Sequence, residues 1–339
     1  MIDESDYMID TDEITEPSVT QARRFPVLAQ LSLLGIVLAV IFSTSFLPSF
    51  IAKKDSVPNE TAPEAPLVLQ QSNLESLAVL TNITLEATAA FVYDVKGKKA
   101  LYTKGSDTVL PLASITKIMT ALVAHELIDE NKKITVPKSA ISQSGASGLD
   151  EGEIISAQSL SDYAMLASSN DAAYALASAV GAVIDTRNPN QTFVNAMNIR
   201  AKELGLGNFT FYNPTGLDID ANQAGALGTA REVTFLMEYI LGNYPSILEP
   251  STFTSTRVYN EAGSYHSAEN TNPIVTRIPN LLGSKTGFTD LAGGNLTVAF
   301  DAGFNRPIII TVLGSSYEGR FSDVEKLVKA VEDSLQTKS

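Results

Sequence analysis

The sequence PLASITKIMTALV, residues 111–123, begins the helical centre of the chain. From Ile115 onward its apolar residues recur at helical spacing. Ser114 therefore falls in the first turn and Lys117 on the same face three residues later, where a neutral amine can take the proton of the hydroxyl. The stretch predicts a helix that carries a serine nucleophile and a lysine base. The alternative interpretation is an exposed helical lysine without a catalytic role.

Strand patterns flank this helical centre, which extends from about Leu112 to Ile240. The first two strands form a hairpin in which Gly97 is expected to supply a positive φ, and the last two precede an amphipathic helix. The predicted strands are Ala89–Tyr93, Lys99–Tyr102, Asn295–Phe300 and Ile308–Leu313, and the helix is Ser322–Leu335. This order predicts an α+β fold in which both chain ends build one antiparallel sheet and a mostly helical insertion packs against it.

The composition excludes several classes of function. With 38 acidic and 24 basic residues the formal net charge is −14, which disfavours binding to nucleic acid. The chain has no cysteine and only two histidines, which excludes disulfides, cysteine nucleophiles and almost every zinc site. We therefore expect no metal and no cofactor, and chemistry that relies on Ser, Lys, Asn, Asp or Glu.

The first part of the chain predicts a membrane anchor. Residues 1–24 form an acidic tail, and residues 25–51 contain the 21-residue apolar stretch Val27–Leu47, long enough to cross a bilayer as one helix. Residues 52–73 have the Pro-containing composition of a linker, and residues 74–339 form the globular domain. The alternatives for the apolar stretch are a cleaved signal peptide and a buried core helix.

Basic residues flank this stretch equally on its two sides. Arg23 and Arg24 precede it, and Lys53 and Lys54 follow it. The positive-inside rule therefore does not decide the orientation, which must be inferred from what the domain does.

Two further motifs carry side chains suited to the same chemistry. Ser168 and Asn170 form a Ser-x-Asn motif, for which the alternative interpretation is a polar loop with a helix N-cap at Ser169 or Asn170. Residues 285–287 read KTG, a combination that is rare by chance and whose alternative interpretation is a surface turn. Each motif alone is a weak signal, but the three together in this order are a strong one.

The three motifs are similar to those of the penicillin-recognising serine enzymes. Their flanks resemble the D-alanyl-D-alanine carboxypeptidases, the low-molecular-weight penicillin-binding proteins of peptidase family S11. The similar stretches are Ala113–Ala121, Ser169–Ala173, Asn213–Asp218, Asn270–Asn272 and Lys285–Thr289, and the resemblance extends over residues 89–330. It implies a β-lactamase/DD-peptidase-like fold, preceded here by the transmembrane helix, with residues 74–339 as the catalytic domain.

The resemblance implies a role for each residue of the first two motifs. Ser114 attacks the carbonyl between two D-alanines and becomes an ester, and neutral Lys117 is the general base. Ser168 relays a proton between Lys117 and the leaving nitrogen. Asn170 hydrogen-bonds the lysine and the substrate amide.

The third motif is implied to bind the substrate. Lys285 supplies a fixed positive charge for the terminal carboxylate, together with the Thr286 hydroxyl, and helps to keep Lys117 uncharged. Gly287 lets the strand lie close to the ligand, which pairs with it as an added edge. The oxyanion hole consists of the backbone amides of Ser114 and Phe288.

The function implied is a serine-type D-Ala-D-Ala carboxypeptidase that trims peptidoglycan stem peptides and is acylated by β-lactams. Because peptidoglycan lies outside the membrane, we expect a single-pass protein of the cell membrane, with a cytoplasmic N-terminus, a catalytic domain outside the cytoplasm and the lipid bilayer as a partner of the N-terminal helix.

Three alternatives stay open. The first is a peptidoglycan DD-endopeptidase of the same family. Many family members carry a further β-rich domain, which this sequence does not predict, and single-domain members include endopeptidases that cut crosslinks. A class A β-lactamase is disfavoured because no Glu-x-x-Leu-Asn loop follows Asn170. A non-catalytic, membrane-tethered peptidoglycan-binding protein is the remaining alternative.

Neither histidine fits another catalytic motif. His125 begins a zinc-protease-like helix, but the fifth position is Asp129 instead of histidine. His266 is expected to have no catalytic role, and no Gly-x-Ser-x-Gly elbow accompanies either histidine. The Gly205-Leu206-Gly207 stretch is better explained as a helix C-cap than as a dinucleotide loop.

Overall fold

The computed structural model describes residues 80–145 and 148–336. The predicted acidic tail, anchor and linker, residues 1–24, 25–51 and 52–73, lie outside the described residues. Among the helices that are described, none is long and apolar enough to cross a membrane.

The described elements are as follows. The α-helices are α2 Lys117–Leu127, α3 Lys138–Ile141, α4 Ala157–Leu166, α5 Asn170–Ile184, α6 Pro189–Glu203, α7 Ala230–Asn243 and α8 Gly319–Gln336. The strands are β1 Ala89–Asp94, β2 Lys99–Lys104, β3 Leu110–Pro111, β4 Lys133–Thr135, β5 Ile154–Ser156, β6 Thr210–Phe211, β7 Ala226–Gly228, β8 Ser255–Tyr259, β9 Tyr265–Glu269, β10 Leu281–Thr289, β11 Gly293–Asp301 and β12 Pro307–Ser315. The short 3-10 helices are η3 Ala113–Thr116, η4 Pro245–Ile247, η5 Glu249–Thr252 and η6 Val275–Arg277.

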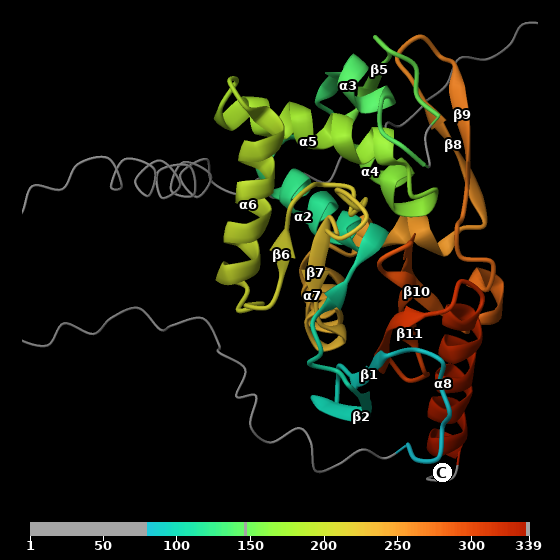
Figure 1. Cartoon of the computed structure of the whole chain (residues 1–339). Coiled ribbons are helices and arrows are strands. Elements are labelled where there is room, and N and C mark those ends of the chain that lie inside the picture. The colour runs from blue at the N-terminus through green and yellow to red at the C-terminus, as the bar shows by residue number, and fades with distance from the viewer. Residues whose placement is uncertain (1–79, 146–147, 337–339) are drawn as a thin grey trace, which may run out of the picture. The chain divides into compact units, whose positions relative to one another are not determined.

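Both ends of the described chain build the central sheet (Figure 1). Its strand order is β10-β11-β12-β1-β2, and each neighbouring pair is antiparallel. The N-terminal hairpin joins the C-terminal strands through β1 and β12, where Ala89 lies opposite Leu313 and Asp94 opposite Ile308. The predicted α+β class, with one antiparallel sheet made from both ends, is thereby confirmed. Strand β10 is left at one edge.

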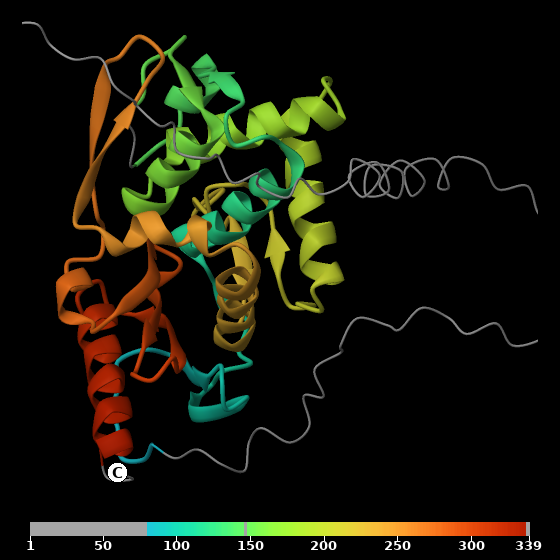
Figure 2. The ribbon, with the colours of Figure 1, turned by 180° about the vertical axis from the view of Figure 1, so that it is seen from behind.

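Helices cover both faces of this sheet (Figures 1 and 2). Along β12, Ile309 and Leu313 point into the core shared with α7, whereas Ile308, Ile310 and Val312 point into the core beneath α8. A strand covered on both faces buries successive residues, which is why this part of the sequence is continuously apolar.

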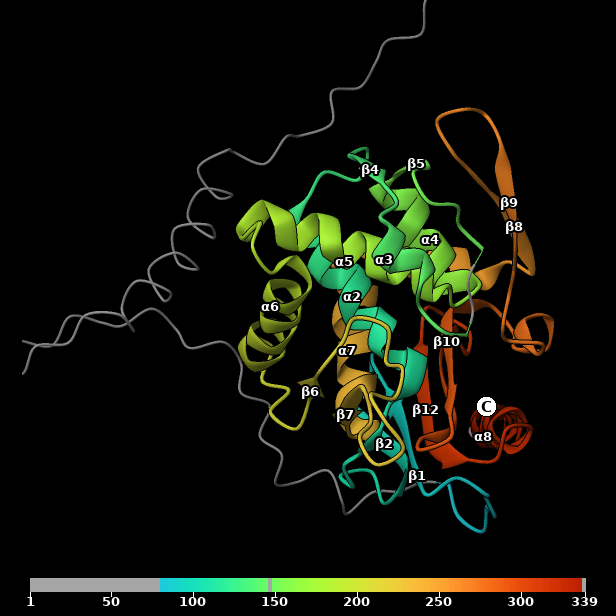
Figure 3. The same cartoon turned by 45° about the horizontal axis from the view of Figure 1, so that its top comes forward.

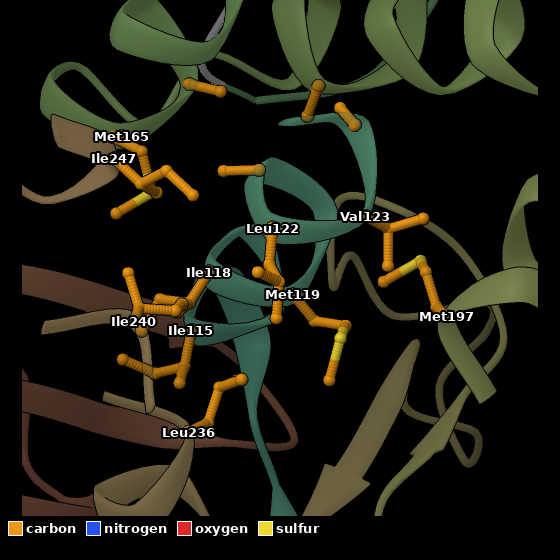
Figure 4. Packing of buried hydrophobic residues seen from close by; sticks show 14 of the residues in the cluster. Ile115, Ile118, Met119, Leu122, Val123, Met165, Met197, Leu236, Ile240 and Ile247 are labelled. Atoms are coloured by element: carbon orange, nitrogen blue, oxygen red, sulfur yellow. The ribbon is translucent and has the colours of Figure 1, made fainter. Parts of the chain in front are cut away.

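The first helix of the insertion is buried on nearly all sides. Helix α2 contacts α4, α5, α6 and α7 (Figure 3). Its side chains Ile118, Met119 and Leu122 are fully buried and pack among residues of these helices, such as Met197 of α6 and Leu236 of α7 (Figure 4). The core therefore fixes the helix that begins at Lys117.

The turn between β1 and β2 corrects one expectation. Lys98 has the positive φ, 48°, and Gly97 does not. The Asp94 carboxylate accepts a hydrogen bond from the Gly97 amide, and a Cβ at this glycine would lie only 2.6 Å from Asp94 Oδ2. Glycine is therefore needed for this close approach, and the left-handed residue is the next one.

Candidate functional site

The serine and lysine of the first motif meet at the start of α2. Ser114 lies in η3 and is half-buried, and Lys117 is fully buried as the first residue of α2. Lys117 Nζ lies 2.8 Å from Ser114 Oγ, within hydrogen-bond distance. The lysine is thus a neighbour of the serine hydroxyl and is not exposed.

The backbone before the serine is strained and firmly held. Ala113 has a φ of 47°, which is uncommon for a residue with a side chain. The Leu112 amide donates to Ala226 O of β7 at 3.0 Å, and Asn295 Nδ2 of β11 donates to Pro111 O at 3.0 Å. The three-stranded sheet β3-β7-β6 and the central sheet together fix the backbone that leads to Ser114.

Burial and a neighbouring cation favour the neutral form of Lys117. Besides Ser114 Oγ, Nζ contacts two acceptors, Asn170 Oδ1 at 2.7 Å and Thr215 O at 2.9 Å. A neutral amine has two N–H bonds for these oxygens and one lone pair, which can accept the proton of the serine hydroxyl. Burial, and then the charge of Lys285, hold the pKa of Lys117 well below that of an ordinary lysine.

The Ser-x-Asn motif approaches from the start of α5. Ser169 caps this helix by accepting a hydrogen bond from the Ala172 amide. The Asn170 side chain is fixed at both ends, because Oδ1 accepts from Lys117 and Nδ2 donates to Ser144 O at 2.8 Å. Ser168 has a φ of 59°, a second strained residue at the site.

Lys285 reaches the site from the edge strand β10. Its side chain is 1% exposed, and Nζ donates to Ser168 Oγ at 2.9 Å and to Thr286 O at 3.1 Å. Burial, and then the charge of Arg320, lower the pKa of Lys285 to about 7. The structure thus gives Ser168 a hydrogen bond to Lys285, and the charge on Lys285 in the free site is titratable near neutrality instead of fixed.

The glycine of the third motif brings two backbones together. A Cβ at Gly287 would lie 2.8 Å from Leu112 O and 3.2 Å from the Ser114 amide nitrogen. The missing side chain therefore lets β10 pack directly against η3, next to one of the two amides predicted for the oxyanion hole. Phe288, which supplies the other, follows on the same strand and is 44% exposed. Thr286 Oγ1 lies 2.6 Å from Thr271 Oγ1.

Sequence reasoning missed Arg320, at the start of α8. It is 3% exposed, donates from Nη1 to Gly287 O at 2.7 Å and lies over the Tyr317 ring. Arg320 lies two residues before the predicted helix Ser322–Leu335, and nothing in the sequence specifies its contact with β10.

The loop Asn213–Asp218 was recognised as similar but was given no role. Asn213 Oδ1 accepts from the amides of Thr215 and Gly216, which orients the Thr215 carbonyl toward Lys117. At the end of the loop, Asp218 Oδ1 accepts from Thr289 Oγ1 of β10. The loop therefore links Lys117 to strand β10.

The remaining candidates lie elsewhere in the described part of the chain. His266 Nε2 is 2.7 Å from Glu153 Oε1, the His125 ring packs on Tyr244, and Gly205 follows α6 with a φ of 74°. Residues 80–145 and 148–336 contain no group of three or more His, Cys, Asp or Glu that could hold a metal ion.

The fold and the site together place a serine hydroxyl beside a buried lysine whose pKa is lowered, an arrangement that suits nucleophilic catalysis by a serine enzyme. Residues 76–316 match the peptidase S11 family, described as D-alanyl-D-alanine carboxypeptidase. The chain belongs to this family.

Similar proteins include enzymes of two specificities. The D-alanyl-D-alanine carboxypeptidase DacF of Bacillus subtilis is 29% identical over 307 residues, covering 87% of this chain and 69% of that protein. A D-alanyl-D-alanine endopeptidase of Escherichia coli is 27% identical over 296 residues, covering 86% and 85%. The cefotaxime-bound structure of penicillin-binding protein D2 from Listeria monocytogenes is 29% identical, with a TM-score of 0.63 over 74% of this chain and 98% of that one.

Proposed function

We propose that the protein is a serine-type D-Ala-D-Ala carboxypeptidase that removes the terminal D-alanine of peptidoglycan stem peptides and is inhibited by β-lactams. The observation that carries the proposal is the set of three contacts at Lys117 Nζ. In the neutral amine, which the lowered pKa of Lys117 favours, two acceptors take the N–H bonds and the lone pair can accept the proton of the Ser114 hydroxyl.

In the acylation step Ser114 Oγ bonds to the carbonyl carbon of the penultimate D-alanine while its proton passes to Lys117. The amides of Ser114 and Phe288 stabilise the oxyanion, each by roughly 3 to 4 kcal/mol. The C–N bond then breaks, and the leaving amine takes a proton by way of Ser168. Water hydrolyses the ester and regenerates the hydroxyl.

The terminal carboxylate binds to Lys285 and to the Thr286 hydroxyl. Binding of an anion beside Lys285 favours its ammonium form and raises its pKa above the value of about 7 in the free site. The bound substrate thereby strengthens the positive charge that lowers the pKa of Lys117.

A second candidate function is a peptidoglycan DD-endopeptidase with the same acyl-enzyme chemistry. The E. coli endopeptidase favours it, since that protein is covered over 85% of its own length. In this case the leaving amine belongs to a second stem peptide.

The proposal extends to the location of the enzyme. The apolar stretch Val27–Leu47 supports a single-pass anchor in the cell membrane, and the substrate class supports a catalytic domain outside the cytoplasm with residues 1–24 inside.

The test is the release of free D-alanine from a tripeptide that ends in D-Ala-D-Ala, measured by mass spectrometry with Ser114→Ala alongside. Release by the native enzyme but not by the variant is the expected result. Acylation of Ser114 by penicillin without release of D-alanine would instead favour the endopeptidase. If neither occurs, a non-catalytic peptidoglycan-binding role becomes the better explanation.

A further inference from the structure

Two turns lie side by side at one end of the central sheet. Because β1 and β12 are antiparallel neighbours, the β1–β2 turn and the β11–β12 turn meet there, and the Val95 amide donates to Pro307 O at 3.0 Å. We call residues 95–99 and 302–306 the two-turn end.

A phenylalanine at this end does not pack in the hydrophobic core. Phe304 is 101% exposed, more than any other large hydrophobic residue in the described part of the chain. Its φ of 58° is unfavourable for an aromatic residue. The turn imposes this conformation, because Asp301 Oδ1 accepts from the amides of Gly303 and Arg306. The turn thus holds the aromatic ring in solvent in a strained conformation, and strained residues cluster at functional positions.

Basic residues gather at the two-turn end although the chain as a whole is strongly acidic. Lys96 Nζ lies 3.4 Å from Phe304 O, and neither Lys96 nor Lys99 forms an ion pair within the described residues. The basic residues at the two-turn end are Lys96, Lys98, Lys99 and Arg306. Two of these are paired, Lys98 with Glu238 and Arg306 with Asp94. Within the described residues, Lys96 and Lys99 are therefore left as cations without an ion pair at the same end as the exposed aromatic ring.

The chain enters the described fold at the same end. The Leu80 amide donates to Leu101 O of β2, and Figure 1 shows the first described residues beside β2 and the C-terminal end of α8. The described part of the chain therefore begins beside β2, next to the two-turn end.

We propose that the two-turn end docks on the surface of an anionic phospholipid bilayer, with the Phe304 ring at the level of the headgroups and the lysines on lipid phosphates. Aromatic rings favour this interface, and lysines near it gain from the negative surface potential. One ring and a few lysines bind weakly on their own, but a tether raises their effective concentration at the membrane. In this respect the inference rests on the proposed anchor.

Docking sets the height of the active site. Gly287 of β10 lies opposite Asn295, which is six residues from Asp301 along β11. At about 3.4 Å per residue, a sheet that stands on this end holds the nucleophile roughly 20 Å above the bilayer surface. The enzyme then acts on stem peptides close to the membrane.

The absence of tryptophan from the chain allows a direct test. The full chain with the substitution Phe304→Trp is reconstituted in vesicles of phosphatidylglycerol and phosphatidylethanolamine that contain brominated acyl chains. We expect a blue-shifted emission and strong bromine quenching. The matched control is Tyr259→Trp on the β8–β9 hairpin, a residue 51% exposed and far from β1 and β2, whose emission should stay that of an indole in water.

Three outcomes would overturn the proposal. The first is quenching of the Phe304→Trp variant no stronger than that of the control, and the second is equal quenching in vesicles of phosphatidylcholine alone. The third is a blue shift on addition of glycan strands but not with lipid. Adding Lys96→Glu and Lys99→Glu should reduce quenching several-fold. Co-sedimentation with the vesicles reports on the anchor and penicillin acylation reports on the site, so failure of either is distinguished from failure of docking.

Discussion

Helix α2 and edge strand β10 each contribute one buried lysine to the site, and the two lysines differ in what surrounds them. Lys117 contacts two acceptor oxygens and one hydroxyl, which together occupy the three hydrogen-bonding positions of its amine. Lys285 contacts one hydroxyl and the carbonyl of Thr286, which leaves donor capacity for a ligand. Burial is the main cause that lowers the pKa of each lysine.

Beyond burial, the two lysines differ in their position in a row of three basic residues, Arg320, Lys285 and Lys117. Burial, and then the charge of Arg320, lower the pKa of Lys285 to about 7, whereas burial, and then the charge of Lys285, lower the pKa of Lys117 well below its usual value. The arginine keeps its charge. The strand lysine is therefore suited to bind an anion, and the helix lysine is suited to the proposed role of base.

The largest effect on the rate of acylation is expected when Lys117, the proposed base, is replaced. Lys117→Ala should slow acylation of Ser114 by about 10³-fold, since proton transfer in the transition state is lost. Lys117→Arg should be equally impaired, because a guanidinium does not lose its proton. The measurement is the rate of acylation by a fluorescent penicillin, with the thermal melting curve as a check on folding. A rate within tenfold of the native one would show that another group is the base.

A large loss of acylation rate is also expected when strand β10 is pushed away from η3. In Gly287→Ala the new Cβ would lie 2.8 Å from Leu112 O, which forces β10 away from η3. Displacement of the oxyanion amides by about 1 Å should reduce acylation by about 10²-fold. The matched control is Gly242→Ala, where a Cβ meets nothing within 4 Å and activity should be unchanged. Equal rates for the two variants would contradict the packing argument.

The parts of the site that the sequence predicted are those with a local pattern. Helical spacing alone places Ser114 beside Lys117, and period-two burial on both faces explains the apolar run of β12. The roles assigned to the three motifs remain predictions, although the structure brings their side chains together.

What the sequence did not reveal depends on packing between distant segments. The Thr215 carbonyl is a backbone group without a signature of its own, and it reaches Lys117 only through the loop built around Asn213. Arg320 reaches β10 because α8 packs along the sheet, 33 residues after Gly287 in the chain. The position of the left-handed residue in the β1–β2 turn was likewise decided by a contact with Asp94.

The two pKa values predict a bell-shaped pH dependence of kcat/KM. As pH rises through the pKa of Lys117 the amine becomes neutral and the rate increases. As pH rises above about 7, Lys285 loses the charge that binds the carboxylate and the rate falls. One pH unit above this pKa the loss should approach tenfold.

Lys285→Arg tests the assignment of the alkaline limb. Because a guanidinium stays charged, the alkaline fall in kcat/KM should move to higher pH or disappear. For the native enzyme the alkaline limb of kcat should lie above that of kcat/KM, since the bound carboxylate raises the pKa of Lys285. An alkaline limb that stays in place in Lys285→Arg would assign the titration to a different group.

The smallest effect on kcat and on the pH dependence is expected when Arg320, at the outer end of the row of basic residues, is replaced. Arg320→Gln removes a positive charge beside Lys285, so the pKa of Lys285 rises and the alkaline limb of kcat/KM moves to higher pH. The same change removes the donor to Gly287 O and should lower kcat a few-fold, about the loss of one hydrogen bond of 1 kcal/mol. The control is Arg277→Gln, which breaks an exposed ion pair with Glu325 and should leave both quantities unchanged. A lower kcat with an unmoved alkaline limb would show that Arg320 holds strand β10 in place but does not lower the pKa of Lys285.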